Sequence, residues 1–196
     1  MRNLLYFSCT LLLSAALFSC RNEETKKGGG DTLKPLVDES TRPQYLKAVT
    51  DAEAAFRSKP GVFDPALANA AIKAYNDYAN FFPKDTLAPE YLFRASDLAQ
   101  GTRNYKQSTI FLERIIEMYP DYRRHPEASF IAAFTYDSYL EREGGEARAK
   151  ELYEYVIKKY PNTRYAEDSK ALLQYIGVPD SVMLDKIIRQ GRQQDQ

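Results

Sequence analysis

The chain has 196 residues, enough for about one folded domain. Its 27 Lys and Arg balance 27 Asp and Glu, and this zero net charge disfavours a basic surface that would bind nucleic acid. The charged fraction of 28% excludes a chain buried wholly in a membrane, and one His with two Cys excludes a metal site built from several such side chains.

Residues 1–19 have the organisation of a secretory signal peptide. Arg2 supplies a positive charge, and an apolar run follows from Leu4 to Phe18. The run is too short for a transmembrane helix, which needs about 20 apolar residues. We therefore expect this segment to direct export and then to be removed.

The end of that segment, Leu17-Phe18-Ser19-Cys20, resembles the lipobox of bacterial lipoproteins. The resemblance implies that the Cys20 thiol is acylated with diacylglycerol and that Cys20 becomes the first mature residue. Two acyl chains are enough for stable membrane anchoring. The alternative is an ordinary signal peptide cleaved elsewhere, but lipidation is favoured because Cys20 stands where the apolar run stops.

Residues 20–43 are expected to form the lipidated, flexible tether. They contain Gly28-Gly29-Gly30, charges of both signs and little apolar material. The acidic pair Glu23-Glu24 resembles the surface-export signals of some bacterial lipoproteins. The cell surface therefore stays open as an alternative to the periplasmic face of the outer membrane.

Residues 44–190 are predicted to be helical, and three of their segments end alike. The segments are YNDYANFFP (75–83), LERIIEMYP (112–120) and YEYVIKKYP (153–161). Each places bulky residues eight, five and one before the proline, on one face of a helix. Proline disfavours continuation of the helix, so we expect each helix to end there.

A second segment recurs after the first two of these prolines. Residues 89–96 parallel residues 126–133, and both the Pro83–Pro120 and the Glu90–Glu127 separations are 37 residues. Internal periods of this size indicate stacked helical units. The pattern resembles the tetratricopeptide repeat: small pairs at Ala95-Ser96 and Ala132-Ala133 match its first helix, and the segments ending in proline match its second.

The resemblance implies an all-α fold, a right-handed α-solenoid of three to four tetratricopeptide-like helix pairs. Asp64 and Pro65 form a favourable helix start. A short helix from Ser181 to Arg189 is expected to cap the stack, followed by a frayed tail at residues 191–196. The turns Pro83–Glu90 and Pro120–Glu127 are each three residues longer than the family norm.

In the repeat family, the inner face of each first helix lines a groove that holds peptides. The matching positions combine acidic and aromatic side chains, which would suit a partner with basic and apolar residues. Packing between repeats is an equally weighted interpretation of the same residues. The candidate groove residues are Glu90, Phe93, Asp97, Gln100, Glu127, Phe130, Phe134 and Asp137.

Catalytic chemistry has no evident candidates in this sequence. His125, the single His, is expected to be an exposed and inert residue in a turn. The one mature Cys is taken up by the anchor, so neither a cysteine nucleophile nor a disulfide is expected. We expect no enzyme activity, no cofactor and no metal.

A lipoprotein signal followed by such repeats is similar to the BamD family and to the repeat domain of the YbgF (CpoB) family. This resemblance implies a lipid-anchored, non-catalytic scaffold that binds other cell-envelope proteins at the outer membrane, with outer-membrane protein assembly as one role. The alternative is a binding lipoprotein that captures a peptide or nutrient. The tyrosine and phenylalanine surplus is interpreted mainly as repeat packing, at Tyr75, Tyr78, Phe82, Tyr119, Tyr153 and Tyr160.

Overall fold

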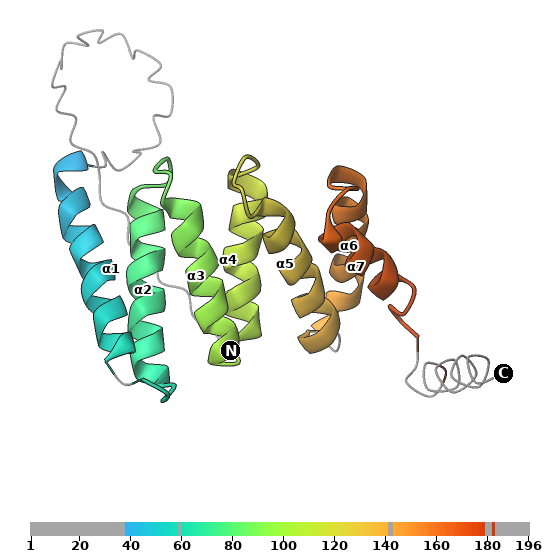
Figure 1. Cartoon of the computed structure of the whole chain (residues 1–196), viewed down its shortest axis with the longest axis horizontal. Coiled ribbons are helices and arrows are strands. Elements are labelled where there is room, and N and C mark those ends of the chain that lie inside the picture. Colours follow the sequence, from blue (N-terminus) through green and yellow to red (C-terminus); the bar gives the residue numbers. More distant parts are fainter. Residues whose placement is uncertain (1–37, 59, 141–142, 179–181, 183–196) are drawn as a thin grey trace, which may run out of the picture. The chain divides into compact units, whose positions relative to one another are not determined.

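A computed structural model describes residues 38–58, 60–140, 143–178 and 182. Within these ranges the chain is all-helical and contains no strand. A 3₁₀ turn, Glu39–Thr41, precedes seven α-helices (Figure 1). Their bounds are α1 Arg42–Arg57, α2 Pro65–Phe81, α3 Ala88–Gly101, α4 Tyr105–Met118, α5 His125–Tyr139, α6 Gly145–Lys159 and α7 Arg164–Leu173.

Each helix packs mainly on the helices that precede and follow it in the chain, and α5 also contacts α7 (Figure 1). One hydrophobic core runs through the stack, from Val49 in α1 to Tyr153 in α6. The predicted small pairs lie inside it, since Ala95-Ser96 and Ala132-Ala133 are fully buried. Small side chains at these positions let neighbouring helices approach closely.

The helices α2, α4 and α6 end in the same way. Their C-cap residues Phe82, Tyr119 and Tyr160 have φ between −130° and −122° and ψ between 51° and 61°. Each cap donates its backbone N–H to the carbonyl four residues earlier, and a proline follows each of them. Because a residue before proline is disfavoured in the α region, the helix stops there. The helix ends predicted at these three prolines are confirmed.

The aromatic residues predicted to form the core divide into two groups. Tyr75, Tyr78, Phe82 and Tyr153 are buried, as predicted. Tyr119 and Tyr160, the residues immediately before the second and third prolines, are only half-buried. The last aromatic residue of the second and third segments is therefore less enclosed than the sequence pattern suggests.

The ends of the predicted helical region differ in how far the structure describes them. The helix α1 begins at Arg42, so the folded part starts two residues before the expected boundary at 44. Asp64 caps α2 as predicted, because its carboxylate accepts the backbone N–H groups of Ala66 and Leu67. The signal peptide, most of the tether, the expected capping helix (apart from Val182) and the tail lie outside the described residues.

Candidate functional site

The eight candidate groove residues come from two helices, four from α3 and four from α5. Their exposure is uneven. Phe93 is 1% exposed, so its ring is enclosed by the protein. Asp97 and Phe134 are exposed, and the other five are half-buried: Glu90, Gln100, Glu127, Phe130 and Asp137.

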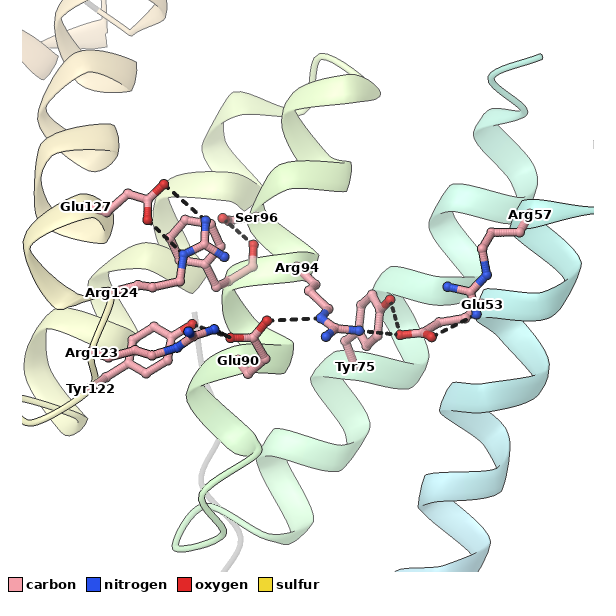
Figure 2. Close-up of polar contacts among 11 residues, drawn as sticks. Glu53, Arg57, Tyr75, Glu90, Arg94, Ser96, Tyr122, Arg123, Arg124 and Glu127 are labelled. Atoms are coloured by element: carbon pink, nitrogen blue, oxygen red, sulfur yellow. Dashed lines mark hydrogen bonds and ion pairs between the residues drawn. The ribbon is translucent and has the colours of Figure 1, made fainter. Parts of the chain in front are cut away.

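Glu90 stands at the centre of a polar network that joins α1, α3 and the turn before α5 (Figure 2). The Tyr122 hydroxyl donates to Glu90 at 2.7 Å, and the Arg94 guanidinium donates to it at 3.2 Å. Arg94 also donates to Glu53 of α1 at 2.8 Å. Burial acts to raise the pKa of Glu90, but these two donors lower it below its usual value.

Glu127 is held by a second cation, Arg124, from the turn immediately before α5 (Figure 2). Two guanidinium nitrogens of Arg124 donate to the two carboxylate oxygens of Glu127 at 2.7 and 3.0 Å. The same guanidinium lies 3.5 Å from the centre of the Phe93 ring. These hydrogen bonds raise the pKa of Arg124 and lower that of Glu127. The structure thus brings Phe93 and Glu127, predicted as separate groove residues, to one arginine.

Asp97 and Gln100 lie further along α3. Burial of the carboxyl group among surrounding protein atoms raises the pKa of Asp97 to about 6, although its side chain still reaches solvent. The positive charge of Arg124 opposes this rise, and the carboxylates of Glu127 and Glu90 add to it. Gln100 donates to the buried Ser108 hydroxyl at 3.2 Å and so joins α3 to α4.

Aromatic rings continue along α5. Phe130 contacts Phe134 at 6.4 Å between ring centres, and Phe134 contacts Tyr139 at 6.4 Å. Tyr139 stacks on Tyr105 at 3.9 Å. Phe134 is 39% exposed and Tyr139 49% exposed, so this part of the row faces solvent. The Tyr153 hydroxyl donates to Asp137 at 3.4 Å, beside the same row.

The expectation that His125 is exposed is wrong. His125 is 1% exposed and is the first residue of α5. Its Nε2 donates to the Ile116 carbonyl at 3.2 Å, and the Tyr160 hydroxyl donates to Nδ1 at 2.7 Å. Burial lowers the pKa of His125. The first turn of α5 thus packs against α4, a contact that the local sequence does not reveal.

A pocket missed by the sequence reasoning lies at one end of the α3–α4 pair. Its volume is about 950 Å³, and it is an open cleft. Two turns form most of its wall, the α2–α3 turn and the α4–α5 turn. Of the predicted groove residues it includes Glu90 alone. The lining residues are Pro83, Lys84, Asp85, Thr86, Leu87, Pro89, Glu90, Arg94, Met118, Tyr119, Pro120, Asp121, Tyr122 and Arg123.

Two further features concern the described residues only. In this part of the chain, no helix has both the length and the apolar character needed to cross a bilayer. Among the same residues, His, Cys, Asp and Glu side chains form no cluster of three or more that could hold a metal ion. Cys20, the predicted lipidation site, lies outside the described ranges. Neither a protein-family model nor a curated protein sequence matches this chain.

Proposed function

We propose that the chain is a lipid-anchored, non-catalytic scaffold that binds other cell-envelope proteins. In this proposal the helices form a right-handed solenoid of three to four tetratricopeptide-like pairs. Acylated Cys20 anchors this solenoid to the outer membrane, where it faces the periplasm. A role in outer-membrane protein assembly is the specific form of this proposal. Exposure of the protein on the cell surface is the alternative placement.

The observation that carries the proposal is the recurrence of one structural unit along the chain. The same cap geometry ends α2, α4 and α6, and a pair of small residues is buried in both α3 and α5. Helices that repeat in this way build extended binding surfaces rather than one enclosed reaction site. The exposed rings of Phe134 and Tyr139 supply such a surface with apolar contact area.

The carboxylates of the candidate face support a binding role over catalysis. Glu90 and Glu127 are both bound by arginines, and their lowered pKa values favour the ionised form at neutral pH. A general acid at that pH needs a raised pKa instead. Asp97 has a raised pKa, but the described charged side chains that shift this pKa are an arginine and two carboxylates held in ion pairs, not activated nucleophiles.

The test is capture of partners by the full chain in living cells. Photo-crosslinking groups placed at Phe134 and Tyr139 are expected to trap envelope proteins, while the same group at the exposed Lys170 of α7 serves as the control. Recovery of no protein partner from either aromatic position would contradict the scaffold role. A small ligand that raises the melting temperature in the same preparation would then favour the binding lipoprotein.

The anchor is tested separately with Cys20→Ala. We expect this variant to leave the membrane fraction and to lose labelling by palmitate. Cys9→Ala changes the other cysteine, which lies within the predicted signal peptide, and is the matched control. Membrane retention of the Cys20 variant with undiminished labelling would refute the anchor.

A further inference from the structure

We propose that Asp97 of α3 receives a lysine or arginine side chain of a partner protein, whose neighbouring apolar side chains pack on the exposed rings of Phe134 and Tyr139. This proposal rests on the scaffold role, since it names the side chain by which the partner is held. It also makes the strength of binding depend on pH, because the carboxyl group of Asp97 must be ionised to receive the cation.

Asp97 differs from the carboxylates near it in having no donor. Glu90 accepts a hydrogen bond from Arg94, and Glu127 accepts two from Arg124. Asp97 accepts none and forms no ion pair among the described residues. A carboxylate that is partly removed from water and lacks a donor is unfavourable, and such groups gather at functional sites. The chain thus leaves open, at Asp97, a position for a donor from outside.

The charges around Asp97 favour a cation. The charged groups that act on it are Glu90 of α3, Arg124 of the turn before α5 and Glu127 of α5. Arg124, the one cation among these described groups, binds Glu127 through two nitrogens and lies over the Phe93 ring, so its charge is already balanced. Ionised Asp97 therefore adds a negative charge with which no described cation pairs. A cationic side chain is attracted to that charge, whereas an acidic one is repelled.

The aromatic row of Phe130, Phe134, Tyr139 and Tyr105 supplies the apolar part of the surface. Each ring contacts the next, at 3.9 to 6.4 Å between ring centres. Phe134 and Tyr139 are 39% and 49% exposed, so their rings are open to a partner. Ring faces also carry negative partial charge and attract cations within about 6 Å. The row therefore suits a segment in which aromatic or aliphatic residues stand beside lysine or arginine.

Asp97 and the row lie within reach of one segment. The helices α3 and α5 begin at the same end of the stack and run in the same direction (Figure 1). Arg124 joins them by contacting Phe93 of α3 and Glu127 of α5. Asp97 follows Phe93 by four residues, about 6 Å along the axis of α3. Phe134 follows Glu127 by seven residues, about 10 Å along the axis of α5. A segment that crosses from α3 to α5 beyond Arg124 can contact both.

The pH dependence follows from linkage between the proton and the partner. In the chain alone, burial raises the pKa of Asp97 to about 6. A bound cation stabilises the carboxylate and lowers this pKa, so binding at acidic pH releases a proton. Affinity should therefore be constant above about pH 7 and should fall about tenfold between about pH 7.5 and about pH 5.

The experiment begins with a selection from a displayed library of random peptides on the full chain, purified in detergent at mildly alkaline pH. We expect enrichment of peptides that combine lysine or arginine with aromatic or aliphatic residues. An enriched peptide remade with citrulline in place of arginine, or norleucine in place of lysine, should bind about tenfold more weakly. Carboxyl carbon NMR of the chain saturated with the original peptide should show the Asp97 titration midpoint below its value of about 6 in the chain alone.

Asp97→Asn removes the ionisable group and keeps a side chain of the same size. This variant should bind the enriched peptide about tenfold more weakly at neutral pH, with little further change as the pH falls. It should nevertheless be at least as stable as the natural chain at neutral pH, because the partly buried charge is gone. A carboxylate with a purely structural role would change stability and leave peptide affinity unaltered. Asp121→Asn removes an exposed carboxylate from the α4–α5 turn and is the control, which should keep both the affinity and its pH dependence.

Three results would overturn the proposal: no enrichment of basic peptides over an unrelated lipoprotein, equal affinity of the natural chain and Asp97→Asn, or an Asp97 midpoint that stays near 6 in the saturated complex. Circular dichroism of each variant verifies that it is folded. Crosslinking from Phe134 and Tyr139 in cells distinguishes this proposal from the scaffold role. Envelope proteins trapped equally by the natural chain and by Asp97→Asn would leave the scaffold role standing and refute the role of Asp97. Failure of both chains to trap any protein would refute the scaffold role itself.

Discussion

The Arg124 guanidinium lies 3.5 Å from the centre of the Phe93 ring while it donates two hydrogen bonds to Glu127. One side chain from a turn thereby joins α3 to α5. A planar guanidinium can stack on a ring and bind a carboxylate at the same time, which an ammonium group cannot do.

Arg124→Lys should therefore destabilise the chain although the charge is kept. We expect the free energy of unfolding to fall by about 1–2 kcal/mol, because lysine loses the stacking on the ring and the second hydrogen bond to Glu127. Urea unfolding followed by circular dichroism measures the loss. Arg123→Lys is the control, because that side chain is 80% exposed and should change little. Equal effects of the two variants would contradict this role of Arg124.

The Glu53 carboxylate holds α1 to its neighbours. It accepts hydrogen bonds from Tyr75 of α2 and Arg94 of α3, both at 2.8 Å. Glu53→Gln should lower the free energy of unfolding by about 1–3 kcal/mol, the range for hydrogen bonds to a charged group. The same unfolding measurement on Asp51→Asn gives the comparison on α1, since the Lys47–Asp51 pair is exposed and should contribute little.

Gly145, the first residue of α6, lies close against the end of α5. A Cβ atom there would lie 2.6 Å from the Tyr136 carbonyl oxygen and 2.7 Å from that of Leu140. Because both are backbone atoms, which cannot move aside easily, Gly145→Ala should lower the free energy of unfolding by about 1–3 kcal/mol. Gly101→Ala is the matched helical control, since its Cβ would meet only the movable Phe63 ring. Comparable melting temperatures for the two variants would show that the contact relaxes easily.

His125 should make stability depend on pH. Burial lowers its pKa in the folded chain, so the unfolded chain binds the proton more readily. Stability should then fall as the pH drops below the ordinary value of 6.5 toward the lower folded value. His125→Gln removes the only His and should flatten this part of the profile, whatever its effect on stability at neutral pH. An unchanged slope of stability against pH would mean that another titrating group causes the dependence.

Asp97 should make stability depend on pH in the direction opposite to His125. Its folded pKa, raised from 3.8 to about 6, means that the folded chain holds the proton more tightly than the unfolded chain. The contribution of Asp97 to stability should thus decrease as the pH rises from about 4 to about 6. Asp97→Asn should remove this decrease and stabilise the chain at neutral pH. Carboxyl carbon NMR of the natural chain should show a titration near 6, and a midpoint near 4 would refute the shift.

The local features of the fold were predictable because they depend on neighbours in the sequence. Proline restricts the residue before it, which places the ends of α2, α4 and α6 correctly. Asp64 caps α2 through backbone groups two and three residues away. His125 shows the limit of such reasoning: its polar flanking residues suggest exposure, but contacts with Ile116 and Tyr160 bury it.

The helices that carry the candidate residues were predictable, but the exposure and partners of each side chain were not. Helical spacing placed Glu90 and Glu127 at equivalent positions of α3 and α5, and both lie in polar networks there. Spacing could not show that Phe93 is enclosed while Phe134 is exposed. Phe93 belongs to the hydrophobic core, and Arg124 lies over its ring from the following turn.

The sequence by itself determined the start of α2 and the ends of α2, α4 and α6, and it supplied the predicted export signal and anchor, because these depend on residues a few positions apart. Only the tertiary structure decided which side chains meet across the stack. The angle and distance between successive helices bring the turns at Lys84 and Arg123 to one pocket, and they bury the Tyr119 hydroxyl where no described residue pairs with it. These quantities follow from packing over the whole core rather than from any local pattern.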